Sequence, residues 1–344
     1  MSVRAGLLRA ILALSMSAMA ASAGLAQAPA PVTRSEMLDF FGFDSEAVTR
    51  MRGGEILRVD MPALEGTDTG LGVAFGMIIP HGVGDCSEQF SGPEMFQIDP
   101  NTLAHGRIDP ENPRGALGKV GLDRAEIDEA TAFLRSARGD DFNLSASEYA
   151  RVGTHAAAGG SSLDAANAAY RELLLGRFES YRQAGLSGIE DYARKGRKVS
   201  QPALELRAAL ANSPILESRL PSFHRHLGRY PQGPLAGVQE RFYWVKRRVE
   251  ERPVFSLIHW SLLVRPEFAF LAERTFYASH TYNAQQVYFG VMPFEQGVMV
   301  FYLNRTFTDK VDVFAKSVAH KIGRGKVAEP IRLIFETLRE RIAG

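Results

Sequence analysis

Cysteine is almost absent from this sequence, because Cys86 is the only one among 344 residues. A single cysteine excludes an intramolecular disulfide, a four-cysteine zinc site and CxxC redox chemistry. The fold must therefore be held together by packing. We expect Cys86 to be a small buried apolar side chain rather than a reactive thiol, since free cysteine is among the residue types most often buried.

The sequence also lacks the motifs that identify common enzyme sites. It has no GxSxG nucleophile elbow, no HExxH zinc pair, no EF-hand loop and no P-loop. His224 and His226 are the closest pair of histidines, but residues two apart do not face each other on a helix. No third ligand stands at a recognisable spacing from them. The sequence therefore predicts neither a metal site nor a cofactor.

An excess of charge of one sign is absent as well. The chain has 40 Lys and Arg against 39 Asp and Glu, for a formal net charge of +1. This balance gives no electrostatic support for nucleic acid or an anionic membrane as a partner. With 45% hydrophobic and 23% charged residues, the composition is that of an ordinary globular protein.

The N-terminus has the pattern of a secretory signal peptide. Arg4 and Arg9 precede an apolar run over 11–23, and small residues follow. This run is shorter than the roughly 20 residues that a membrane span needs, so a cleaved signal is favoured over a retained anchor. We expect a signal peptide over 1–26, a tether over 27–34, and a soluble protein that is secreted, or periplasmic if the host is a Gram-negative bacterium.

The remaining chain, 35–344, is expected to form a single α+β domain. Two short helical patterns come first, and then "GEILRVDMP" and "GLGVAFGMIIP" predict a hairpin because a turn-like "EGTDTG" separates them. A helical insertion follows over 121–230. Its longest helix begins after Ser161, whose spacing to Asp164 fits a capping box, and ends at Gly185.

From 238 to 342 the sequence predicts antiparallel strands and C-terminal helices. Four segments have strand character, namely "ERFYWVKRRV", "PVFSLIHWSLLV", "ERTFYASHTYNAQQVYFGVM" and "GVMVFYLNRTF". Short connections predict that neighbouring strands pair antiparallel. Two apolar helical faces follow, separated by Gly323 and Gly325. We expect a curved antiparallel sheet with a C-terminal helix packed across it.

This order of two strands, helices, several strands and a final helix resembles the helix-grip arrangement of START-like domains. The resemblance covers 52–110 and 238–342 and implies a cavity between the sheet and the last helix. "FYW" at 242–244, "YASH" at 277–280 and "YLNRTFTD" at 302–309 also look like segments of a family of uncharacterised exported bacterial proteins. That second resemblance implies export and no particular activity.

The adjacent Ser279 and His280 raise the question of a serine hydrolase. Neighbouring side chains on a strand point to opposite faces, so these two would not form a nucleophile and base pair. Without a nucleophile elbow, nothing else in the sequence supports hydrolysis by Ser279.

Five side chains on the late strands are the candidates for a ligand site: Trp244, His259, His280, Tyr282 and Arg305. His259 and His280 stand among apolar residues, where an unsatisfied ring nitrogen costs about 1–3 kcal/mol. They are either core histidines bonded to a tyrosine hydroxyl or a backbone carbonyl, or polar groups that orient a ligand in an apolar pocket. Arg305 either pairs with Asp309 or Glu273, or binds a ligand carboxylate or phosphate.

These residues fit two functions, binding or catalysis. A structural or protein-interaction role is a third possibility for the protein. The first is binding of a lipid or other small hydrophobic molecule, because both faces of "VFSLIHWSLLV" are apolar and both need cover. The alternative is an enzyme that acts on envelope material, with His259 or His280 as general base and Arg305 holding an anion. Convergence of these three side chains on an open cleft would favour the enzyme.

The predicted signal can be checked by the intact mass of the protein recovered from culture fluid or periplasmic extract. We expect a chain that begins at Gln27, because the small residues before that point suit signal peptidase. A chain that retains residues 1–26 in the cell would contradict export by this signal.

Overall fold

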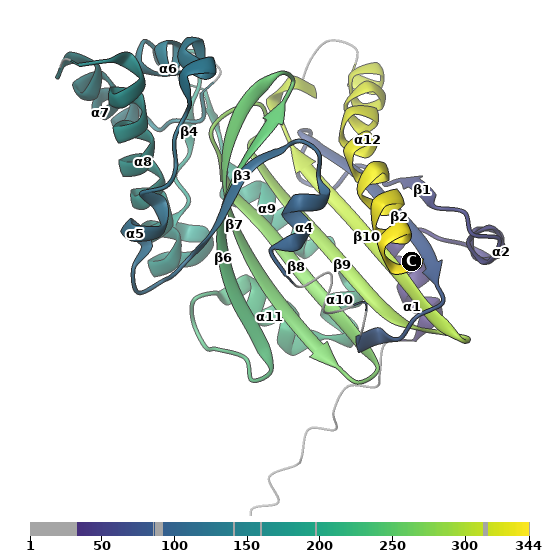
Figure 1. Ribbon diagram of the computed structural model, residues 1–344. Coiled ribbons are helices and arrows are strands. Elements are labelled where there is room, and N and C mark those ends of the chain that lie inside the picture. The colour runs from purple at the N-terminus through teal and green to yellow at the C-terminus, as the bar shows by residue number, and fades with distance from the viewer. Residues whose placement is uncertain are drawn as a thin grey trace, which may run out of the picture. The chain divides into compact units, whose positions relative to one another are not determined.

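An eight-stranded, wholly antiparallel sheet is the centre of the fold (Figure 1). The strand order is β1-β2-β10-β9-β8-β7-β6-β3. The strands are β1 (Leu57–Asp60), β2 (Gly70–Ile79), β3 (Thr102–Ile108), β6 (Val238–Val249), β7 (Arg252–Arg265), β8 (Phe268–Ala278), β9 (Ala284–Phe294) and β10 (Gly297–Phe307). With helices on both sides of this sheet, the α+β class predicted from the sequence is confirmed.

The structure is a computed structural model that describes residues 33–84, 86, 92–139, 142–158, 160–196, 198–311 and 316–343, all in one compact unit, Val32–Gly344. The predicted signal peptide and most of the predicted tether lie outside the described residues. The tether prediction extends one residue too far, because the first helix, α1, already begins at Arg34 with Thr33 as its N-cap.

Helices cover both faces of the sheet (Figure 1). They are α1 (Arg34–Phe41), α2 (Ser45–Arg52), α4 (Glu94–Ile98), α5 (Pro113–Leu117), α6 (Ile127–Leu134), α7 (Ala146–Ala157), α8 (Ser162–Ala184), α9 (Pro202–Ala211), α10 (Pro214–Arg219), α11 (Pro221–Arg229) and α12 (Lys316–Ala343). We call the side that α12 and α4 cover the helix-12 face. The other side, against which α1, α2, α10, α11 and the helical insertion pack, is the opposite face.

The hairpin and the long helix predicted from the sequence are confirmed. β1 and β2 pair antiparallel, with Leu57 opposite Gly76. α8 begins after Ser161, whose hydroxyl accepts from the Asp164 amide at 3.2 Å, and Gly185 follows its last residue. Each of these features depends on local spacing and turn chemistry, which a sequence shows directly.

The late part of the sheet has five strands rather than the predicted four. "ERTFYASHTYNAQQVYFGVM" spans parts of β8 and β9, and the chain reverses between Ala278 and Ala284. Thr281 lies in this loop with φ of 74°, a left-handed value that is rare for a β-branched residue. The single-strand prediction is wrong because the loop contains no glycine or proline that would mark the reversal.

The C-terminal helix is also longer than predicted. α12 runs without a break through Gly323, Gly325 and Pro330. Glycine costs only about 1 kcal/mol in a helix interior, and tertiary packing of an apolar face outweighs that cost. The helix buries Ala328, Ile331, Phe335 and Leu338 with apolar residues of the helix-12 face. Phe335 lies 5.6 Å from Phe75 between ring centroids.

The helical insertion joins β3 to β6, which are neighbours in the sheet. Besides its helices it contains a small sheet of β4 (Tyr192–Ala193) and β5 (Val199–Ser200), which the sequence did not predict. Tyr181 of α8 stacks on Phe276 of β8, with ring centroids 3.9 Å apart. Such stacks add to the apolar burial that attaches the insertion to the opposite face.

A buried ion pair inside the insertion gives a stability prediction. The Arg177 guanidinium lies 2.6 Å from Glu148, and only 3% of each side chain is exposed. Arg177→Met should lower the free energy of unfolding by about 3–5 kcal/mol in urea titrations, because the Glu148 carboxylate would lose its main counter-charge while buried.

Arg151→Met is the matched control for this prediction. Arg151 lies 3.8 Å from the same carboxylate but is 53% exposed, so its loss should cost less than about 1 kcal/mol. Equal losses for the two variants would contradict the role given to burial.

Candidate functional site

A cavity of about 930 Å³ lies between the helix-12 face and α12. Its lining comes from β2, β6, β8, β9 and β10, from the loops at one end of these strands, and from α12. The volume falls in the range of about 300–1,000 Å³ that is typical of small-molecule sites. This cavity has room for a ligand, so we treat it as the candidate site.

The α12 wall of the cavity is mostly apolar, and its two charged side chains, Lys326 and Glu329, are exposed. Val327, Ile331 and Ile334 recur at helical spacing and point to the same side of the helix, and Ile322 extends the wall by more than one turn. Most charged lining residues lie instead on the sheet or at the ends of strands.

The sheet wall is polar along β10 and β9. Tyr302, Asn304 and Thr306 alternate along β10 and so share one face. Gln285 Nε2 donates to Thr306 Oγ1 (2.9 Å), which donates to Asn304 Oδ1 (2.7 Å), and Asn304 Nδ2 donates to the Tyr302 hydroxyl (3.4 Å). These four side chains form one hydrogen-bonded chain across the wall, which we call the polar row.

Two charged groups lie beside the polar row. Glu273 accepts from the Trp260 indole at 2.6 Å, and burial raises the pKa of its carboxyl. Arg247 Nε is 3.1 Å from Asp99 Oδ2, so the guanidinium is neutralised by a carboxylate from the loop before β3. Glu273 therefore favours the protonated form more than an exposed glutamate does, while Arg247 does not present an unpaired positive charge.

The rim of the cavity combines an ion cluster with strained backbone. Glu250 pairs with Lys310 and, at 2.6 Å, with Lys326 of α12, and these hydrogen bonds lower the pKa of Glu250 to about 2. Glu250, Glu251 and Thr281 have φ of 50°, 64° and 74°. Glu250 and Glu251 form the two-residue turn between β6 and β7, where positive φ is usual. Thr281 is the unusual one, because left-handed backbone costs roughly 1–2 kcal/mol for such a residue, and strain of this kind gathers at functional sites.

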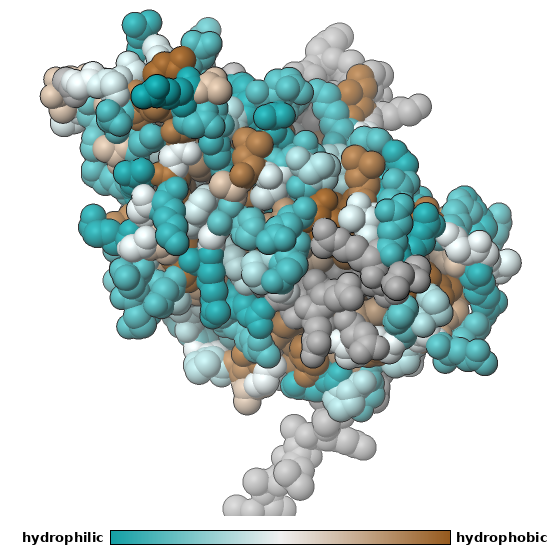
Figure 2. Space-filling model, viewed as in Figure 1, coloured by the Kyte–Doolittle hydropathy of each residue, from teal (hydrophilic) through white to brown (hydrophobic). Residues whose placement is uncertain are grey.

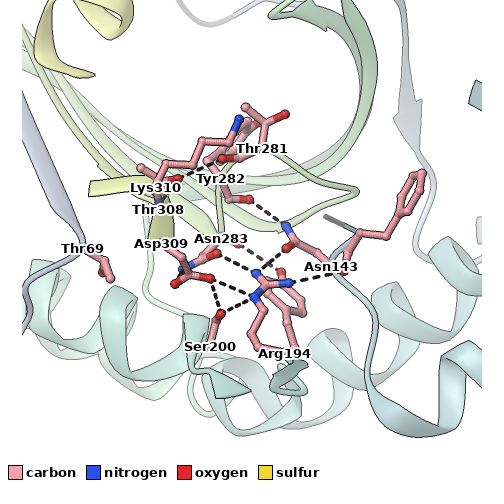
Figure 3. A network of polar contacts seen from close by, with 12 residues as sticks. Thr69, Asn143, Arg194, Ser200, Thr281, Tyr282, Asn283, Thr308, Asp309 and Lys310 are labelled. Carbon is pink, nitrogen blue, oxygen red and sulfur yellow. Dashed lines mark hydrogen bonds and ion pairs between the residues drawn. The ribbon is translucent and has the colours of Figure 1, made fainter. Parts of the chain in front are cut away.

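A polar network holds the loop that closes one end of the cavity (Figure 3). Arg194 donates to Asp309 (2.8 Å), Asn143 (2.7 Å) and Asn283 (3.0 Å). Asn283 also donates to Asp309 at 3.0 Å, and its neighbour Tyr282 lines the cavity. The network thus connects the helical insertion to the lining through Asn283.

Among the five residues predicted for the site, Tyr282 alone lines this cavity. Its hydroxyl is 2.9 Å from Ser256 Oγ. Trp244 is buried on the opposite face, in the apolar cluster beneath the helical insertion. The reason is register, because Trp244 pairs with Leu257 and both side chains point away from α12.

His259 lies on the opposite face in a complete hydrogen-bond network. Arg274 donates to the Tyr181 hydroxyl (3.1 Å), which donates to His259 Nδ1 (2.9 Å), and His259 Nε2 donates to Glu240 (2.5 Å). Burial lowers the pKa of His259. The crevice beside His259 and Arg274 has essentially no volume for a water molecule.

His280 and Arg305 are buried at two other places. His280 Nε2 donates to the Pro253 carbonyl at 3.1 Å, and Nδ1 is 2.7 Å from the Thr281 hydroxyl. Arg305 points to the opposite face and donates to the Pro62 carbonyl, and burial lowers its pKa to about 10. Neither Asp309 nor Glu273, the partners considered for it, forms an ion pair with Arg305 among the described residues.

Sequence reasoning missed most of the polar wall. Tyr302, Asn304 and Thr306 alternate in "YLNRTF", which is the signal that a polar strand face would give. The intervening Arg305 drew attention instead, and it points to the other face. Ser279, considered as a nucleophile, is buried and accepts a hydrogen bond from the Phe255 amide at 3.1 Å.

Comparison with known proteins gives no match to a family model, to a curated protein or to a solved structure. Within the described ranges, no three His, Cys, Asp or Glu side chains are placed to hold a metal ion. None of the described helices has the length and hydrophobicity needed to cross a bilayer.

The pair of His226 and Glu240 predicts a pH-dependent contribution to stability. His226 contacts Glu240 through Nε2 and the Gly233 carbonyl through Nδ1, so both nitrogens donate. The Glu240 contact raises the pKa of His226 above 6.5. Burial alone would raise the pKa of Glu240, but the contacts with His226 and His259 outweigh burial and lower this pKa to about 2. His226 therefore stabilises the fold below pH 6.5 and less as pH rises through its folded-state pKa. Glu240 stabilises it above pH 4.5 and less as pH falls toward 2.

We expect His226→Gln to lower the free energy of unfolding by about 1.5–3 kcal/mol at pH 5–6, and by less as the pH rises further. Urea titrations across this range measure the difference. In a Glu240→Gln background, the change in the free energy of unfolding caused by His226→Gln should no longer depend on pH. A difference that grows above pH 7 would contradict the assigned pair.

Proposed function

We propose that this protein is exported and binds a small, predominantly hydrophobic molecule between its sheet and α12. The observation that carries the proposal is the cavity of about 930 Å³ with an apolar helix wall. Ligand sites are typically apolar concavities with a few placed polar groups, and the polar row and Glu273 would be such groups here. Backbone strain at Thr281, which lines the cavity, adds support.

Binding is favoured over an enzyme with a histidine base. A general base must reach the proton that it removes, directly or through one water. His259 has both ring nitrogens bonded to protein groups, and His280 is fully buried with both nitrogens bonded. Neither of them lines the cavity, and Arg305 points to the other face of the sheet.

A role as a docking surface has less support. On the face that Figure 2 shows, hydrophilic residues predominate, and hydrophobic residues are exposed in small separate groups. Protein and membrane interaction sites are usually marked by larger contiguous apolar patches.

Binding can be tested with N-phenyl-1-naphthylamine, a neutral probe whose fluorescence rises in apolar surroundings. We expect saturable binding at one site per chain. Val327→Trp should weaken it at least tenfold, because the indole would occupy part of the cavity. Isothermal titration calorimetry of the same proteins measures the stoichiometry.

Leu333→Trp is the matched control on the same helix, since Leu333 is exposed and does not line the cavity. It should bind the probe as the unmodified protein does. Absence of saturable binding to the unmodified protein, or equal binding by both variants, would overturn the proposed site.

A further inference from the structure

The two walls of the cavity differ in polarity along its length, and this difference defines a class of ligand. We propose that the occupant is a rigid, facially amphipathic molecule, with hydroxyl groups on one face and hydrocarbon on the other, such as a hydroxylated polycycle. This inference rests on the proposed function, because it concerns the same cavity.

The polar row has hydrogen-bonding capacity that its own members do not use. Among the described residues, the Gln285 side-chain oxygen receives no donor, and one carboxyl oxygen of Glu273 receives none. The Tyr302 hydroxyl accepts from Asn304 and keeps its proton for another acceptor. These groups come from three strands, so they are spread over the wall rather than gathered at one end.

A plain hydrocarbon chain would suit this wall poorly. Covering a donor or acceptor without replacing its hydrogen bond to water costs about 1–3 kcal/mol for each group. A ligand with several hydroxyls on one face avoids this cost, and its other face can lie against Val327, Ile331 and Ile334. A ligand with a single polar head would satisfy one end of the wall only.

The charges of the lining argue against a free anionic head as the main contact. Arg247 is paired with Asp99, and Lys310 and Lys326 are paired with Glu250. Arg248 also lines the cavity, and its exposed side chain has no ion pair among the described residues. An anion bound at one of the three paired cations would have to displace a carboxylate, and one bound at Arg248 would stay in contact with water, where an ion pair contributes little. Neutral hydroxyl groups need no such exchange.

The size of the cavity fits this class. A volume of about 930 Å³ lies near the upper end of the range of about 300–1,000 Å³ that is typical of small-molecule sites, so it has room for a polycycle.

The test compares cholate, deoxycholate and lithocholate, which carry three, two and one ring hydroxyls on the same skeleton with the same carboxylate. Displacement of N-phenyl-1-naphthylamine, below the aggregation concentration of each compound, gives relative affinities. We expect cholate to bind at least tenfold more tightly than lithocholate, although lithocholate is the more hydrophobic. Palmitate, with a single polar head, should compete more weakly than cholate.

Thr306→Val tests the polar row, because it removes one hydroxyl from the middle of the chain and keeps the side-chain shape. It should reduce the preference for cholate over lithocholate at least threefold while lithocholate binding stays within twofold. Thr154→Val, at an exposed position of α7, is the control and should leave the preference unchanged. Thermal unfolding checks that each variant is folded. If Thr306→Val does not fold, the relative affinities of the three bile salts for the unmodified protein decide whether the ligand is facially amphipathic.

The outcomes separate this inference from the proposed function. Affinity that rises with hydroxyl number and depends on Thr306 supports both. If the probe binds saturably but lithocholate or palmitate competes most tightly, affinity follows hydrophobicity. That result overturns the facially amphipathic ligand and still supports a hydrophobic binding site. Absence of saturable binding of the probe overturns both.

Discussion

The packing of α12 on only part of the sheet is the constraint on which the other features depend. Phe335 and Leu338, in the C-terminal half of the helix, are buried against the helix-12 face, while Ile322, near its start, is 57% exposed. The apolar contact therefore holds the C-terminal part of the helix on the sheet, and the cavity lies beside the stretch from Ile322 to Ile334. Within that stretch Lys326 reaches Glu250 at the rim, so an exposed ion pair connects the helix to the β6–β7 turn.

The two faces of the sheet use polar groups in different ways. On the opposite face, Arg305, Gln286, Arg274 and His259 occupy directly opposed positions on four neighbouring strands, all of them buried. Arg274 and His259 find partners in helices and in strand β6, and the space beside them is closed. On the helix-12 face the polar row opens onto a cavity. A buried network whose members are all bonded specifies packing, whereas groups with unused capacity next to a void are suited to recognition.

Several features of the fold and the site could be predicted from the sequence. The hairpin of β1 and β2, the helix from Ser161 to Gly185 and the antiparallel pairing of the late strands follow from turn residues, caps and short connections. Tyr282 was among the predicted site residues and lines the cavity. The polar row was accessible in principle, because its β10 members alternate in the sequence.

The sequence by itself determined most of the helices and strands and the antiparallel pairing of the late strands, because these depend on residues close together in the chain. Only the tertiary structure decided which face of each late strand looks toward α12, since both faces are apolar and periodicity alone does not distinguish them. That choice placed Trp244, His259 and Arg305 in the core. A register shift between Leu257 and Ile258 also put Phe276 and Tyr277, adjacent in the chain, into the same apolar cluster. Such shifts arise from packing between distant segments, which no local pattern records.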